Sequence, residues 1–233
     1  MYMDWSYVVL VLPAVLFSLI ASLIVKTTFK KYSSVLCRCS GAEAARAVLS
    51  YGGAAGVMIT SVSGDLTDHF DPSTGTIALS QSVHSVRSVA AVGVAAHEAG
   101  HAIQHEVGYL PSVIRTAIVP VTNFGSKIAL PLIIAGLVLE SFAPFFVTIG
   151  YIGLICYGLC FVFQLVTLPV EFNASRRAVS ILSEYGILAG DELKGAKKVL
   201  TAAALTYVAA MTVTLMQLLR FLILLQGGRS RRR

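Results

Sequence analysis

The sequence contains few charged residues. Asp, Glu, Lys and Arg make up 13% of the 233 residues, whereas about 25% is usual in soluble domains. Hydrophobic residues make up 56%. The deficit argues against an ordinary soluble domain and predicts a membrane protein. The net charge of +6 does not indicate nucleic-acid binding, because basic residues beside membrane spans are expected from topology alone.

Cysteine is also scarce. Cys156 and Cys160 lie inside an apolar run, and Cys37-x-Cys39 has no second pair in reach to complete a zinc site. The four cysteines therefore predict no disulfide framework, which fits a reducing compartment. The chain also lacks internal repeats, so nothing indicates a repeat architecture.

Four long apolar runs are present. Residues 5–25 carry no charge and are long enough to cross about 30 Å of hydrocarbon. They lack the basic start and the cleavage site of a signal peptide, so we predict a retained anchor. Further spans are predicted at 118–139, 146–168 and 201–222, with a turn at 140–145 between the second and the third.

Two polar blocks, 26–117 and 171–198, then lie on the same side of the membrane. They hold most of the Lys and Arg residues, so the positive-inside rule places them in the cytoplasm. The basic tail, 226–233, would end outside, against the same rule, unless the last helix does not fully cross. We expect a multi-pass protein of the inner (plasma) membrane with its active site facing the cytoplasm.

The first polar block predicts a small α+β unit. Residues 40–43 form a capping box that begins a helix, and residues 57–63 are typical of a strand. Residues 68–80 predict a hairpin with Asp-Pro and Gly in its turn. A helix over 83–107 is expected to end at Gly108.

The second half of that helix contains His-Glu-x-x-His. His97 and His101 are four residues apart, so their rings project from one helix face and both can reach a zinc ion at about 2.0–2.1 Å. Glu98 is rotated by about 100° and stands beside the ion, where it can take a proton from an activated water. The small Ala99 and Gly100 would leave room for a substrate. The alternative is that the histidines only hydrogen-bond their neighbours.

A catalytic zinc site needs a third protein ligand. His105 lies about 12 Å from His97 along the helix axis, too far for a shared tetrahedral site, so it is expected nearby or on the surface. Glu171 is the best candidate. Pro169 is expected to break the preceding span, and Glu171 would sit in the first turn of a new polar helix that ends near Gly186, where the helix dipole favours a carboxylate. The alternative is that Glu171 only caps that helix.

Three stretches together, "AAHEAGHAIQHEVGY", "FQLVTLPVEFNASRRA" and "GAKKVLTAAALTYVAA", resemble the YugP-type neutral zinc metallopeptidases of bacterial membranes, and so does "LTDHFDP". The resemblance implies a zinc peptidase with ligands His97, His101 and Glu171 and catalytic base Glu98, a scheme similar to that of HtpX-like membrane proteases. Related sites often carry an acid two or four residues after the ligand Glu. Asn173 and Ser175 stand there instead, so a carboxylate that orients a ligand histidine is missing or comes from elsewhere.

We therefore predict a mainly α membrane protein with about four transmembrane helices and a small α+β zincin-like domain at the membrane surface. The predicted segments are an anchor, a zincin-like domain, a helical hairpin, a third-ligand helix, a last span and a basic tail. Their bounds are 1–27, 28–117, 118–168, 169–200, 201–225 and 226–233.

The predicted activity is peptide-bond hydrolysis by a zinc-dependent metalloendopeptidase with Zn²⁺ as cofactor. Expected partners are a peptide or membrane-protein substrate and the lipid bilayer, and no nucleic acid; a partner protein or oligomer stays open. Candidate oxyanion-stabilising or supporting residues are His69, His105, Asn173, Ser175, Arg176, Arg177 and Tyr207. By resemblance to zincin folds, the substrate would add beside an edge strand formed by Thr76, Ile77, Ala78, Leu79 and Ser80; the alternative is an ordinary core strand.

Three alternative functions fit the sequence less well. A zinc-binding membrane transporter or sensor without hydrolase activity would favour ionisable residues within several spans, and the spans contain almost none. An intramembrane metalloprotease would bury the motif within a span, but this helix is too short and too polar to cross. If the protein were a non-catalytic scaffold, the His-Glu-x-x-His motif would have arisen by chance.

Overall fold

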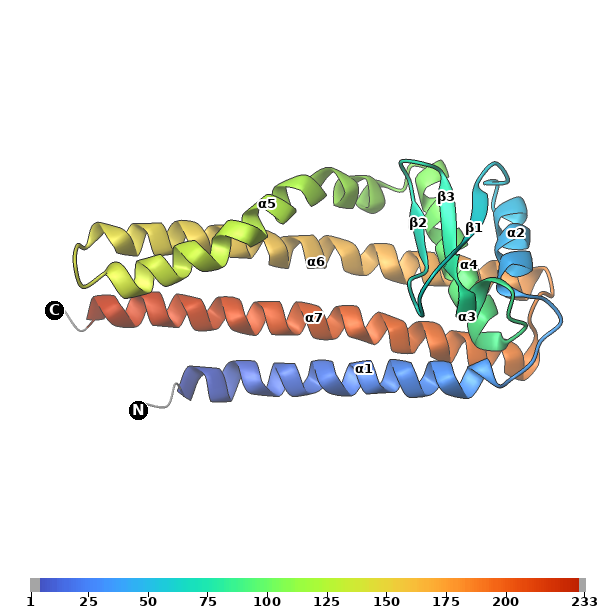
Figure 1. The fold of residues 1–233 in the computed structure, drawn as a ribbon, viewed down its shortest axis with the longest axis horizontal. Coiled ribbons are helices and arrows are strands. Elements are labelled where there is room, and N and C mark those ends of the chain that lie inside the picture. The colour runs from blue at the N-terminus through green and yellow to red at the C-terminus, as the bar shows by residue number, and fades with distance from the viewer. Residues whose placement is uncertain (1–4, 231–233) are drawn as a thin grey trace. The chain divides into compact units, whose positions relative to one another are not determined.

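The computed structural model describes residues 5–230, which are mostly helical with a small three-stranded sheet. The last three residues of the basic tail lie outside the described residues. In chain order the elements are a π-helical turn (Tyr7–Val11), α1 (Leu12–Ser33), α2 (Gly41–Tyr51), β1 (Met58–Val62), β2 (His69–Asp71), β3 (Thr76–Ser80), α3 (Gln81–His84), α4 (Val89–Glu106), α5 (Leu110–Leu139), α6 (Phe145–Glu184) and α7 (Gly190–Ser230) (Figure 1).

The chain forms two compact units. One comprises Met1–Ile20, Ile114–Thr167 and Tyr207–Arg233, and the other comprises Ala21–Val113 and Leu168–Thr206. The sheet, α2, α3 and α4 all belong to the second unit, which we call the polar unit. The first unit, the apolar unit, consists of long helical segments.

Within residues 5–230, four helices are long and apolar enough to cross a membrane, and each overlaps one predicted span. They are Tyr7–Ser33, Leu110–Leu139, Phe145–Glu184 and Gly190–Gly227. The predicted turn at 140–145 is confirmed, because α5 ends at Leu139 and α6 begins at Phe145.

The helix that carries Glu171 differs from the prediction. α6 continues through Pro169 to Glu184 as a single 40-residue helix. Proline removes one backbone donor, but the helix geometry continues beyond it, as it also does at Pro120 and Pro131 in α5. The predicted helix start near Glu171 was therefore wrong, and no helix N-terminus stabilises this carboxylate.

Local signals position the short elements as expected. The capping box is confirmed: Ser40 N donates to Glu43 Oε2 at 2.7 Å, and Glu43 N donates to Ser40 Oγ at 3.3 Å. Gly75, with φ of +62°, ends the turn between β2 and β3, where an L side chain would be strained. Gly108 follows α4 with φ of +60°.

The predicted helix over 83–107 is two helices. α3 ends at His84, and Ser88 begins α4 as an N-cap whose side chain accepts a hydrogen bond from Ala91 N at 3.2 Å. A serine side chain competes for backbone donors, and here it caps a new helix instead of continuing the old one. The single helix expected over 83–107 was therefore wrong at its start, because Ser88 caps a new helix.

The sheet order is β1-β3-β2, with β3 parallel to β1 and antiparallel to β2. The hairpin and the strand of 57–63 were predicted, but the parallel pairing with β1 was not. This pairing places β3 in the centre of the sheet. The end of β3 extends past the short strand β2, and there the backbone N–H of Ser80 donates to Asp68 Oδ1 at 2.8 Å. Thr76 to Ser80 therefore offer no free edge, and the predicted substrate edge strand was wrong. The alternative, an ordinary core strand, agrees with the structure, because Ile77 and Leu79 are fully buried.

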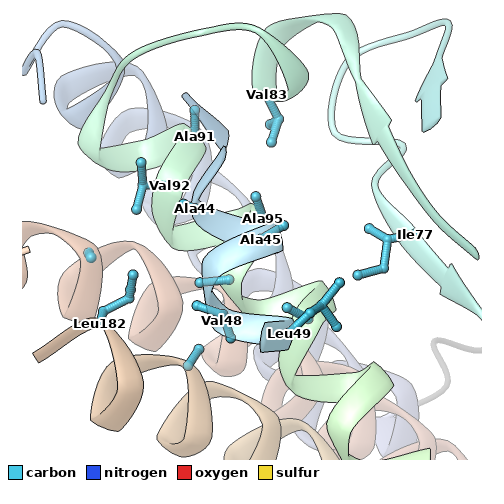
Figure 2. Close-up of a cluster of buried hydrophobic side chains, with 14 of the residues drawn as sticks. Ala44, Ala45, Val48, Leu49, Ile77, Val83, Ala91, Val92, Ala95 and Leu182 are labelled. Atoms are coloured by element: carbon cyan, nitrogen blue, oxygen red, sulfur yellow. The ribbon is translucent and has the colours of Figure 1, made fainter. Parts of the chain in front are cut away.

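The core of the polar unit joins α2, α4, the sheet and the second half of α6. Figure 2 shows Ala45 of α2 beside Ala95 of α4, and the same cluster includes Val48 and Leu49 of α2, Ile77 of β3 and Leu182 of α6. The α4 residues that face this core are small, so neighbouring helices approach closely. This packing fixes the helix that carries His97 and His101.

Candidate metal centre

The close approach of α4 to α6 depends on Gly100. A Cβ at this position would lie 2.5 Å from the backbone oxygen of Ala174 on α6, far inside van der Waals contact. Ala99 is fully buried in the core. These small residues therefore make room for α6, and the predicted space for a substrate beside them was wrong. The absent side chain lets α6 bring its polar residues to the histidines.

Three side chains from these two helices converge on one point. His97 Nε2 lies 3.2 Å from Glu171 Oε2, His101 Nε2 lies 3.4 Å from the same oxygen, and the two Nε2 atoms are 3.1 Å apart. Ligands bound tetrahedrally at about 2.05 Å from zinc lie about 3.3 Å from one another. The triangle therefore fits three ligands of one tetrahedral zinc ion, and the N, N, O donor set matches that of catalytic zinc sites.

The pKa values of the three groups reflect their burial and proximity. Burial alone would raise the pKa of Glu171, which is 2% exposed, but hydrogen bonds with His101 and His97 hold it well below the ordinary range. Burial alone would lower the pKa of His101, but the hydrogen bond and charge of Glu171 and the charge of Glu98 raise it. Both shifts come from the close contact between the Glu171 carboxylate and the imidazoles.

The second nitrogen of each imidazole also has a partner. Ser175 Oγ lies 3.0 Å from His97 Nδ1, and Gln104 Oε1 lies 3.1 Å from His101 Nδ1. A ligand histidine is usually oriented by a hydrogen bond of this kind. The supporting groups are thus a hydroxyl from α6 and an amide from α4, whereas the resemblance had suggested a carboxylate.

Gln104 is the residue that the sequence reasoning missed. It is fully buried and follows His101 by three residues, which places both on the same face of α4. Its Nε2 donates to the backbone oxygen of Val170 at 2.7 Å and to Asn173 Oδ1 at 3.0 Å. The i, i+3 spacing from a ligand histidine was the available signal.

Glu98 also lies next to the triad. The residue is 9% exposed, and its charge contributes to the raised pKa of His101. Among the described residues, none hydrogen-bonds to its carboxylate. The oxygens of this carboxylate can therefore accept hydrogen bonds from a water molecule or a substrate.

The remaining predicted residues divide into two groups. Asn173 and Arg177 belong to the hydrogen-bond network behind His101, since Arg177 Nε donates to Asn173 Oδ1 at 2.8 Å. Of the others, His69, His105 and Arg176 take no part in this network among the described residues. His69 is exposed and its Nδ1 is 2.8 Å from Thr67 O, His105 packs 5.8 Å from the Phe70 ring, Arg176 is exposed, and Tyr207 belongs to the apolar unit.

Comparisons with known proteins identify the family to which the chain belongs. The family model described as "Putative neutral zinc metallopeptidase" matches residues 7–226. A protein of Bacillus subtilis (strain 168) named "Putative membrane protease YugP" is 44% identical over 226 residues, which cover 96% of this chain and 98% of that protein. No solved structure matches the chain.

Proposed function

The chain belongs to the neutral zinc metallopeptidase family, and from that premise we propose that it is a membrane-embedded zinc metalloendopeptidase. His97, His101 and Glu171 would hold the ion. The observation that carries the proposal is the triangle of three ligand atoms, 3.1–3.4 Å apart. Beside it lies the Glu98 carboxylate, which accepts no hydrogen bond from any described residue. A three-ligand site leaves a fourth position for water or substrate, as catalytic zinc sites do.

The mechanism assigns a proton-transfer role to Glu98. When bound, zinc polarises a peptide carbonyl and lowers the pKa of a water molecule. Glu98 takes a proton from the attacking water and passes it to the nitrogen of the leaving amine. Because Glu98 is little exposed, most bulk water is kept away from its carboxylate. The carboxylate therefore exchanges its proton with the reactants and not with the solvent.

The four apolar helices and the membrane protease relative support a position in the membrane. We propose a multi-pass protein of the plasma membrane whose metal centre faces the cytoplasm and whose substrates are peptides or membrane proteins.

The test is Glu98→Gln in the full-length protein, purified in detergent. We expect zinc content to stay at the wild-type level, because Glu98 is not a ligand. Cleavage of a casein-type substrate should fall by roughly 10²–10⁴-fold, because the proton acceptor is lost. Zinc is measured by atomic emission and cleavage by the release of labelled peptides.

The matched control is Glu106→Gln, an exposed residue at the end of the same helix, which should cleave like the wild type. Retained cleavage in Glu98→Gln would remove Glu98 from its role. A wild-type protein that binds zinc but cleaves none of the substrates offered, including membrane proteins, would favour the zinc-binding transporter or sensor.

A further inference from the structure

The hydrogen bonds behind His101 form a chain with a defined direction. Arg177 Nε and Gln104 Nε2 both donate to Asn173 Oδ1, at 2.8 and 3.0 Å, and Gln104 Oε1 lies 3.1 Å from His101 Nδ1. All four residues lie in the polar unit. Each link has a donor and an acceptor, so fixing one end fixes the orientation of every group along the chain.

Arginine fixes the far end, because a guanidinium can only donate. The atom of Asn173 that faces Arg177 Nε must therefore be its amide oxygen. The same oxygen faces Gln104, so Gln104 presents its NH₂ group there. The backbone oxygen of Val170, which can only accept, faces that same NH₂ group at 2.7 Å and requires the same orientation independently.

The near end follows from this orientation. With its NH₂ group held by two oxygens, Gln104 must turn its own oxygen to His101 Nδ1. That nitrogen must then carry the proton, which leaves the lone pair of the neutral imidazole on Nε2. Nε2 is the atom that lies 3.4 Å from Glu171 Oε2 and 3.1 Å from His97 Nε2.

We infer that Gln104, held by Asn173, Arg177 and the Val170 carbonyl, is a positioning residue that selects the His101 tautomer able to bind the metal through Nε2. The inference rests on the zinc centre of the proposed function and not on peptide hydrolysis. A neutral amide performs the task because its orientation is determined by the acceptors on α6. Residues 170–177 of α6 thus supply the ligand Glu171 and, through Gln104, also orient the ligand His101.

The experiment measures zinc affinity by chelator competition on full-length protein in detergent, with zinc alone as the probe. Gln104→Met keeps the side-chain length but removes the acceptor, and we expect zinc binding to weaken by about 10–100-fold. The matched control is Gln81→Met, an exposed glutamine at the start of α3, which should bind zinc like the wild type.

A second pair of variants keeps the inference testable if Gln104→Met does not fold. Asn173→Asp retains an oxygen that accepts from both Arg177 and Gln104, so zinc affinity should be at least that of the wild type. Asn173→Leu removes this acceptor and should bind several-fold more weakly, since only Val170 then holds the amide. Arg177→Met should also weaken binding, whereas the exposed neighbour Arg176→Met should not.

A spectroscopic measurement separates tautomer selection from general packing. In zinc-loaded, ¹⁵N-histidine-labelled wild type, we expect His101 to show a proton on Nδ1 and a metal-coordinated Nε2. Wild-type zinc affinity in Gln104→Met, equal losses in both Asn173 variants, or a proton on Nε2 would overturn the inference. A wild type that binds no zinc would instead overturn the proposed function.

Discussion

His97 Nε2, His101 Nε2 and Glu171 Oε2 are electron-rich atoms that lie within 3.4 Å of one another. Such crowding is unfavourable unless a cation or a proton lies between them. Because Glu171 raises the pKa of His101 above its ordinary value of 6.5, protons compete with zinc in mildly acidic solution. The stability of the metal complex therefore depends on pH through the protonation of His101.

Zinc affinity should be constant above the raised pKa of His101 and fall as the pH drops through it. Below that pKa, the metal must displace the proton, which costs about tenfold in apparent affinity per pH unit for each proton released. Chelator competition between pH 5 and pH 9 measures this slope. Affinity that did not change with pH would show that no imidazole gives up a proton.

Glu171→Ala should lower zinc affinity by more than about 100-fold, beyond the loss of a supporting hydrogen bond, because it removes a ligand. The metal content of the purified variant measures the loss. Glu184→Ala, an exposed carboxylate at the end of the same helix, is the control and should retain zinc. Full occupancy in Glu171→Ala would point to a different third ligand.

At the scale of elements, the site depends on two helices that nearly touch. Gly100→Ala would place a Cβ 2.5 Å from Ala174 O, so α4 and α6 must separate. We expect a loss of stability of about 1–3 kcal/mol, as is usual for overpacking, together with weaker zinc binding. Thermal unfolding and chelator competition on the same preparation measure both effects.

Gly93→Ala is the matched control on the same helix. A Cβ there would lie 3.5 Å from Ala196 Cβ, an ordinary contact, and alanine favours a helix over glycine by about 1 kcal/mol. This variant should be as stable as the wild type or more so, with unchanged zinc affinity. Equal behaviour of the two variants would show that the contact at Gly100 does not position the ligands.

At the scale of the whole molecule, four spans and the positive-inside rule predict which segments face the cytoplasm. In a variant without its native cysteines, Glu106→Cys should react with an impermeant thiol reagent only after cells are opened. Ser141→Cys, in the turn between α5 and α6, should react in intact cells. The reverse labelling pattern would show that the orientation is opposite to the predicted one. A Glu106→Cys variant that never reacts would show that this end of α4 lies within the membrane.

Much of this architecture is readable from local sequence. The capping box at Ser40, the turn glycines and the His-Glu-x-x-His spacing are each set by interactions within a few residues, and uninterrupted apolar runs mark the long helices. Glu171 was reached by elimination and resemblance, and its place beside His97 and His101 agrees with that choice. The helix break at Pro169 was expected from backbone chemistry alone, yet α6 continues through it.

The sequence by itself determined which side chains can bind zinc, because ligand chemistry and an i, i+4 spacing belong to single residues and to one helix. Only the tertiary structure decided that β3 is central, that Gly100 admits α6, and that Gln104, Asn173 and Arg177 line up behind His101. These features join residues that lie about 20 to 75 positions apart along the chain, and the orientation of an amide depends on which acceptors packing brings to it.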